Sequence, residues 1–164
     1  AQIAGNANVT EGLIYKYFKD KKDLLYQVLN DHFIKFQEKI EDRIVKEKTC
    51  IKQLEIIILS SLESYADNRT FSKILLLEVR NSLDFFDSGA YEMIRKYSRT
   101  ILEIIEKGIE KGELKSDVNP YILRKVILGA IEHACLGEII FSRKLDIDEI
   151  STGISNIVFN GAKA

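Results

Sequence analysis

Residues 9–25, with the sequence VTEGLIYKYFKDKKDLL, decide how this chain begins to fold and what it contacts. Ile14 and Phe18 are four residues apart, so a helix over this stretch places both on one face, where they anchor it to a core. Hydroxyl, phenol and lysine side chains occupy the opposite face. Thr10 is suited to cap the helix, because its hydroxyl can accept from backbone N–H groups two or three residues on. A short helix with such a polar face suits a phosphate backbone, and the stretch predicts a DNA-binding head.

The residues on either side extend this pattern. Residues 1–6 are interpreted as the end of a preceding helix, and Asn8 tolerates the left-handed conformation of a tight turn. Asp20 is expected to cap the next helix, which runs from about residue 21 to about residue 48. Its apolar side chains keep helical spacing: Leu25, Leu29, Phe33, Phe36, Ile40 and Ile44. Residues 1–47 therefore form a predicted head with a linking helix, and residues 48–164 a predicted body.

The rest of the chain predicts further helices and no sheet. It contains a single proline, Pro120, and few strand-like alternations. Helical spacing predicts helices over about residues 50–67, 90–111, 120–142 and 146–161, and another apolar stretch covers residues 71–83. Asn119 is expected to cap the helix that starts with Pro120, and Gly112 to end the helix before it. The predicted fold class is all-α, with a helix-turn-helix head joined by a long helix to a helical body.

Composition excludes several classes of protein. Hydrophobic residues make up 46% of the 164 residues and charged residues 30%, which provides for a core and argues against wholesale disorder. The net charge is −1, so a nucleic-acid contact requires a local patch; residues 16–22 supply one, with four lysines against one aspartate. The longest apolar runs, residues 56–59 and 74–77, have four residues each, which is too short for a membrane span.

The sequence offers no constellation of residues for catalysis. Cys50 and Cys135 lie far apart without metal-ligand spacing, and we interpret them as buried thiols in a reducing cytosol. There is no Gly-rich phosphate loop, no HExxH and no paired His/Cys set, so we expect no enzyme, no cofactor and no metal. A purely structural helical protein would account for the body but not for the polar face of residues 10–21.

Side-chain chemistry assigns two roles on the polar face. Base edges in the major groove suit Glu11, Leu13 and Lys16, which match a cytosine amine, a thymine methyl and guanine. Gly12 permits close approach of the backbone to DNA. The side chains better suited to phosphate are Thr10, Tyr15, Tyr17 and Lys21.

The run from Ile3 resembles the signature of TetR-family transcriptional regulators. It reads Ile-Ala-x-x-Ala, a turn residue, Val-Thr-x-Gly, and then x-Ile-Tyr-x-Tyr-Phe-Lys-x-Lys-x-Asp-Leu-Leu, all in register. Asn8 stands where the turn glycine is usual, and Glu11 where a basic residue is common. The resemblance implies a cytoplasmic all-α homodimer that binds double-stranded operator DNA and represses transcription until a small-molecule inducer enters the body. It also implies a first helix that would precede residue 1.

Two helices near the C-terminus suggest where such a dimer forms. Small and apolar side chains share one face of the helix over residues 120–142, and isoleucines form a stripe on the last helix. They are Val126, Ala130, Ala134, Gly137 and Phe141, with Ile150, Ile154 and Ile157. Packing within one chain and a four-helix interface between two copies both remain open. DNA readers of this type usually work as dimers, which favours the interface.

The body also resembles the acyl-CoA-sensing subgroup of the family in the short segments 77–82, 111–120 and 129–132. An apolar pocket with basic groups at its mouth would suit a long-chain acyl-CoA or another apolar ligand. The candidate ligand residues are Tyr65, Phe71, Arg80, Phe85, Tyr91 and Arg95, with Phe33, Phe36 and Arg124 as further candidates. Core packing is the alternative for each aromatic, and a surface role for each arginine. The alternative function is a multidrug-type repressor of an efflux gene, with an aromatic cation pocket.

Overall fold

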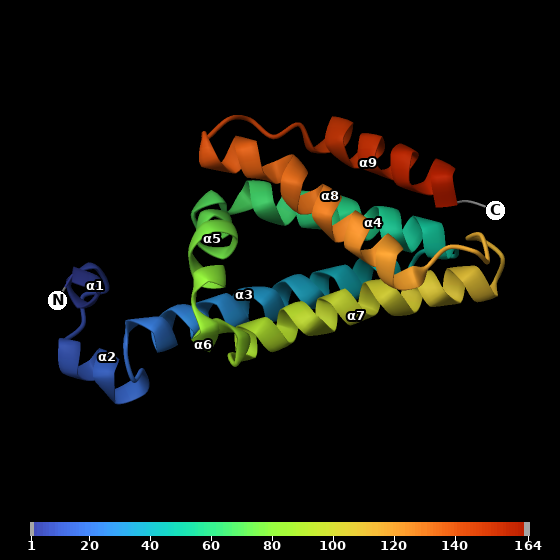
Figure 1. Ribbon diagram of the computed structural model, residues 1–164. Coiled ribbons are helices and arrows are strands. Elements are labelled where there is room, and N and C mark those ends of the chain that lie inside the picture. Colours follow the sequence, from blue (N-terminus) through green and yellow to red (C-terminus); the bar gives the residue numbers. More distant parts are fainter. Residues whose placement is uncertain (1, 163–164) are drawn as a thin grey trace.

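The computed structural model describes residues 2–162, over which the regular elements are all helices. The head consists of α1 (Gln2–Asn6) and α2 (Glu11–Tyr17), which project beyond one end of the helical body (Figure 1). The long helix α3 (Lys21–Ile44) runs from the head into the body and packs along α7 (Gly89–Glu110), and the two run in the same direction. The all-α prediction is confirmed.

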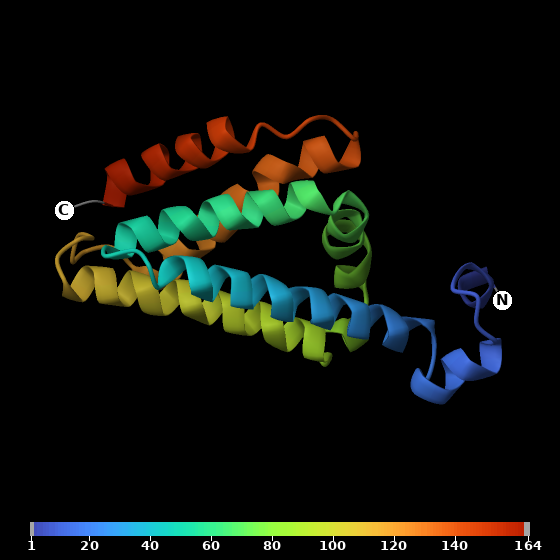
Figure 2. The same ribbon diagram turned by 180° about the vertical axis from the view of Figure 1, so that it is seen from behind.

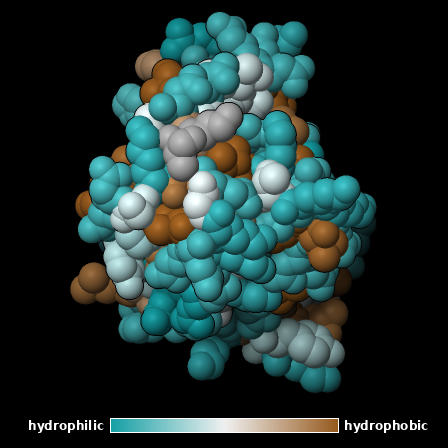
Figure 3. Space-filling view, turned by 90° about the vertical axis from the view of Figure 1, so that its right-hand side faces the viewer, coloured by the Kyte–Doolittle hydropathy of each residue, from teal (hydrophilic) through white to brown (hydrophobic). Residues whose placement is uncertain are grey.

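A second layer covers these two helices. It contains α4 (Cys50–Asp67), α8 (Pro120–Ile140) and α9 (Ile147–Ala162), and α4 packs against each of the other two (Figure 2). No helix in residues 2–162 is both long and apolar enough to cross a bilayer. The end of the body far from the head shows a mostly hydrophilic surface with scattered apolar groups (Figure 3).

An irregular segment joins the two layers at the end nearest the head. This connecting segment, residues 69–86, starts with α5 (Arg69–Lys73), continues as a π-helix (Ile74–Glu78) and a 3₁₀ turn (Val79–Asn81), and ends in α6 (Leu83–Phe86). It descends from the end of α4 to the start of α7 (Figure 1). The apolar stretch at residues 71–83 is therefore not one regular helix.

Local sequence signals explain most helix ends. The side chain of Thr10 accepts from the backbone N–H of Leu13 at 3.3 Å, and that of Asp20 accepts from Asp23 at 2.8 Å. Asn119 caps α8, with Pro120 in its first turn. Asn8 has φ 53°. All four agree with the sequence signals.

Some predicted boundaries were too long. The helix α3 ends at Ile44, about four residues before the predicted end, and α8 ends at Ile140, where Ser142 turns the chain with φ 55°. Neither end carries a glycine or a proline that would mark it in the sequence.

Two buried clusters hold the body together. The larger lies between α3, α4, α7, α8 and α9, and its fully buried members include Ile40, Leu54, Ile57, Ile105 and Ile127. The smaller lies where α3, the connecting segment and the start of α7 meet, and consists of Leu29, Phe33, Phe71, Leu75, Val79, Phe85 and Ala90. The smaller cluster lies inside the end of the body from which the head projects.

Gly108 provides a test of the larger cluster. A Cβ at this buried position of α7 would lie 3.1 Å from Leu114 Cδ1 and 3.2 Å from Cys50 Cβ. Such overpacking costs about 1–3 kcal/mol, which exceeds the gain of about 1 kcal/mol for alanine over glycine inside a helix. We therefore expect Gly108→Ala to lower the free energy of unfolding in urea. The control is Gly161→Ala, since nothing lies within 4 Å of a Cβ there; equal stability of the two variants would contradict the close packing.

Candidate DNA-binding head and ligand cavity

The predicted DNA-contacting side chains lie together on the outside of the head. All of them are exposed, whereas Ile14 and Phe18 are half-buried. We call the exposed set the recognition face: Thr10, Glu11, Gly12, Leu13, Tyr15, Lys16, Tyr17 and Lys21. A Cβ at Gly12 would meet nothing within 4 Å, so packing within the chain does not require glycine at this position.

Two aspartates fix the start of α3 behind the recognition face. Asp20 accepts from the backbone N–H of Asp23, and the Asp23 carboxylate accepts from the backbone N–H of Lys19 at 2.8 Å. The second bond lowers the pKa of the Asp23 carboxyl. This reciprocal pair satisfies backbone donors at the helix start and sets the angle at which the chain enters α3.

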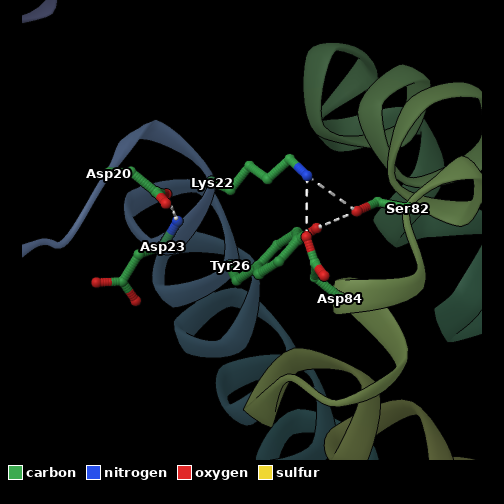
Figure 4. A network of polar contacts seen from close by, with 6 residues as sticks. All are labelled: Asp20, Lys22, Asp23, Tyr26, Ser82 and Asp84. Atoms are coloured by element: carbon green, nitrogen blue, oxygen red, sulfur yellow. Dashed lines mark hydrogen bonds and ion pairs between the residues drawn. The ribbon is translucent and has the colours of Figure 1, made fainter.

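A polar cluster connects the start of α3 to the connecting segment (Figure 4). Lys22 Nζ lies 2.9 Å from Asp84 Oδ2 and 3.4 Å from Ser82 Oγ. The Tyr26 hydroxyl lies 3.1 Å from the same Ser82 oxygen, and the Tyr26 ring packs on Phe85 with centroids 5.7 Å apart. We call Lys22, Tyr26, Ser82 and Asp84 the head–body joint. The ion pair is exposed to solvent, which screens the attraction between the two charges. The contact between the Tyr26 and Phe85 rings therefore contributes most of the stability of this joint.

The body contains a cavity of about 420 Å³. Its walls come from α3, α4, the connecting segment, α7 and α8. Among the lining residues, Phe33, Gln37 and Leu75 are buried. Arg95 and Arg99 also line the cavity and are exposed to solvent. The cavity thus has a mostly apolar interior and arginines at its rim.

Five of the six predicted ligand residues line this cavity: Tyr65, Phe71, Arg80, Tyr91 and Arg95. Phe85 does not. It is 1% exposed and lies behind the wall, where its ring packs against Tyr26 and Tyr91. Phe33, Phe36 and Arg124 line the cavity as well.

Sequence reasoning missed several wall residues. Gln37 is buried on α3 between Phe33 and Ile40, so a polar residue at a core position was the available signal. Glu132 stands on a largely apolar helix, which is a similar signal. Arg99 and Tyr97 follow Arg95 within two turns of α7 and gave no distinct signal.

The rim arginines differ in what they contact. Arg80 donates to both carboxylate oxygens of Glu132, at 3.0 and 2.5 Å, and this contact raises the pKa of the Arg80 guanidinium. Arg95 lies 3.5 Å from Glu92. Arg99 and Arg124 form no ion pair with the carboxylates of residues 2–162, and Arg124 lies over the Tyr121 ring. These two arginines are therefore the cations best able to receive an anionic group.

The predicted dimer residues divide into two groups. Val126, Phe141 and Ile157 are exposed, and Ala130, Ala134 and Gly137 are half-buried on α8. Ile150 and Ile154 instead pack against the larger cluster of their own chain. Ile122 and Ile140, which the sequence reasoning did not select, add to the exposed apolar surface of α8.

Comparison with known proteins places this geometry in a family. The Fatty acid metabolism regulator protein of Bacillus subtilis (strain 168) is 26% identical over 98% of this chain and 83% of its own length. The crystal structure of the transcriptional regulator FadR from Bacillus subtilis in complex with stearoyl-CoA has a TM-score of 0.89 and 26% identity, over 97% of this chain and 86% of that chain.

A structure of the fatty acid degradation regulator FadR from Bacillus halodurans shares the fold, with a TM-score of 0.87 and 21% identity over 97% of this chain and 86% of that one. Residues 29–161 match the TetR family model described as "YsiA-like protein, C-terminal region". This match spans well over half of the chain, which therefore belongs to the TetR family of transcriptional regulators and is not an enzyme.

Proposed function

We propose that this chain acts in the cytoplasm as a homodimeric repressor, which binds operator DNA through its recognition face and releases it when a long-chain acyl-CoA occupies the cavity. The observation that carries the proposal is the cavity itself: an apolar interior of about 420 Å³ with arginines at its rim. This volume lies within the usual range of ligand pockets. An acyl chain suits the interior, and the phosphates of CoA suit the arginines.

The charges around the cavity favour an anionic ligand over a cationic drug. Among the lining residues that the structure describes, Glu132 alone is acidic, and its carboxylate already accepts hydrogen bonds from Arg80. Arg95, Arg99 and Arg124 add positive charge that repels a cation. The relative titled as a complex with stearoyl-CoA supports the same choice. A multidrug-type function has no such observation in its favour.

The connecting segment gives the cavity a route to the head. Phe71, Leu75 and Arg80 of this segment line the cavity, and a few residues later Ser82 and Asp84 contact the start of α3. A ligand that displaces the cavity wall therefore acts on the helix that carries the head. Because the two recognition helices of a dimer must fit major grooves about 34 Å apart, a small rotation of α3 is enough to lose DNA affinity.

The dimer and the division of the chain are parts of the same proposal. Three exposed apolar side chains support a two-fold interface there: Val126 on α8, Phe141 at the end of α8, and Ile157 on α9. Residues 1–47 would serve as head and linking helix, and residues 48–164 would bind ligand and partner.

The ligand part is tested with a duplex that the protein selects from a random-sequence pool. Palmitoyl-CoA should release this duplex at micromolar concentration or below, and Arg124→Gln should raise the concentration needed by about tenfold, since a charge-assisted bond is lost. Lys125→Gln is the matched control, because Lys125 is exposed on the same helix and does not line the cavity. Fluorescence anisotropy measures the release. Retention of the duplex with acyl-CoA of every chain length would refute the ligand assignment.

The DNA part is tested through salt dependence. Lys21→Ala should weaken binding about equally on every duplex and reduce the slope of log K against log salt by about one unit, because one phosphate contact is lost. Lys48→Ala, in the connection between α3 and α4 and far from the head, should leave the slope unchanged. Tyr15→Phe should weaken binding without changing the slope. An unaltered slope in Lys21→Ala would argue against this contact.

The coupling part is tested at the head–body joint. Lys22→Met removes the contacts with Asp84 and Ser82, so ligand affinity should stay unchanged while the ligand-induced loss of DNA affinity shrinks about two- to fivefold, the range expected of an exposed pair. Lys52→Met is the control, since it removes a comparable exposed pair with Glu55 on α4. An unchanged ratio of DNA affinities with and without ligand in Lys22→Met would exclude the joint from the coupling.

A further inference from the structure

Three hydroxyl groups of the cavity wall, on Ser61, Ser72 and Tyr97, have a common property: each proton already has an acceptor within the chain. Ser61 Oγ donates to the Ile57 carbonyl at 2.7 Å, so the Tyr97 hydroxyl, 2.7 Å away, is the donor to Ser61. Ser72 donates to the carbonyls of Tyr65 and Asn68, at 3.0 and 2.9 Å. What these hydroxyls still offer is acceptor capacity.

Gln37 completes this inner wall, which we define as Gln37, Ser61, Ser72 and Tyr97. Its side chain is 2% exposed and lines the cavity. Nε2 donates to Glu41 Oε1 at 2.8 Å and to Thr100 Oγ1 at 3.2 Å. The amide oxygen, Oε1, is buried and has no hydrogen-bond partner within residues 2–162.

The orientation of the amide follows from its partners. Glu41 forms an ion pair with Lys96, whose Nζ lies 3.0 Å from Glu41 Oε1, and an ionised carboxylate can only accept. The amide atom that faces it must therefore be the nitrogen. Thr100 uses its own proton on the Lys96 carbonyl, which again requires a donor from Gln37. A flip of the amide would break both contacts, and Oε1 stays on the side without a partner.

A buried carbonyl oxygen without a donor costs free energy comparable to a lost hydrogen bond. Such groups are few in native structures, and each calls for an explanation. Gln37 lines the cavity, so a molecule bound there is the nearest source of a donor for Oε1, which the side chains of the wall cover in the ligand-free chain.

We infer that the cavity recognises a hydrogen-bond donor on its ligand, with Gln37 Oε1 as the acceptor and the inner-wall hydroxyls beside it as further acceptors. The inference rests on the acyl-CoA function proposed above and adds that the bound ligand carries a hydrogen-bond donor. An unsubstituted acyl chain carries no donor. The donor is an O–H or an N–H, supplied either by a hydroxyl on the acyl chain or by an amide of the pantetheine arm.

The test compares two ligands and three proteins. Calorimetry gives the dissociation constants of palmitoyl-CoA and 3-hydroxypalmitoyl-CoA for the wild-type chain, for Gln37→Met and for Thr100→Val. Methionine keeps the length of the side chain and removes the amide, so Oε1 is lost together with the two hydrogen bonds of Nε2. Thr100→Val takes one partner from Nε2 and leaves Oε1 in place, so it serves as the matched control.

Gln37→Met should weaken binding about five- to tenfold, and Thr100→Val should not. A loss confined to the hydroxylated ester assigns the donor to the acyl hydroxyl, and an equal loss on both esters assigns it to the pantetheine amide. The melting temperatures of the ligand-free variants are measured alongside, because methionine also loses the Nε2 bonds to Glu41 and Thr100. An affinity loss in Gln37→Met with a melting temperature equal to that of Thr100→Val assigns the loss to the missing acceptor.

Two results overturn the inference in distinguishable ways. If the wild-type chain binds both esters and Gln37→Met binds them equally well, or if Thr100→Val loses as much affinity as Gln37→Met, the role of Gln37 is refuted and the proposed function stands. If the wild-type chain binds neither ester, the proposed function fails and this inference fails with it.

Discussion

The packing of α3 along α7 is the constraint on which the rest of the structure depends. The helix α3 belongs to both parts of the molecule, since its start carries the head and its buried residues Leu29, Phe33, Gln37 and Ile40 form part of the body. With 24 residues it is about 36 Å long at 1.5 Å per residue. A rotation of five degrees about one end of a rod of this length moves the other end by roughly 3 Å, comparable to the rise of one base pair. The contacts that fix this helix therefore also set where the head lies.

The irregular geometry of the connecting segment explains how one stretch of chain serves two sites. In a π-helix each backbone hydrogen bond spans five residues instead of the four of an α-helix, and single π-helical turns are frequent at functional sites. Here a π-helix precedes the 3₁₀ turn that holds Arg80, which contacts Glu132 on α8, and Ser82 and Asp84 follow at the head–body joint. A regular helix over the same residues would present these side chains in a different register. The segment is thus built to contact α8 on one side and α3 on the other.

The sequence predicted the parts of the structure that depend on local signals. Thr10, Asp20, Asn119 and Pro120 mark helix starts, because capping is decided within one turn. The irregular course of residues 74–81 escaped prediction, since its apolar residues follow no pattern that separates a π-helix from an α-helix. Phe85 was wrongly expected to line the cavity, since tertiary packing alone decides whether an aromatic side chain faces a cavity or is buried beneath its lining residues. Gln37 was visible as a polar residue within an apolar stripe, but its unpartnered oxygen depends on Glu41 and Thr100, which only the folded chain brings together.

The division of the core into two clusters reconciles stability with response. The larger cluster, around Leu54, Ile57 and Ile105, lies mainly between α4, α7, α8 and α9, with Ile40 as its buried residue from α3. The smaller one supplies Phe33, Phe71 and Leu75 to the wall of the cavity, whereas Ile131 is the buried residue of the larger cluster that lines it. Elements that move on ligand binding must come from the less stable part of a structure. On the function proposed above, a ligand that enters between α3, α7 and the connecting segment would repack the smaller cluster and move α3, while the larger cluster keeps the body folded.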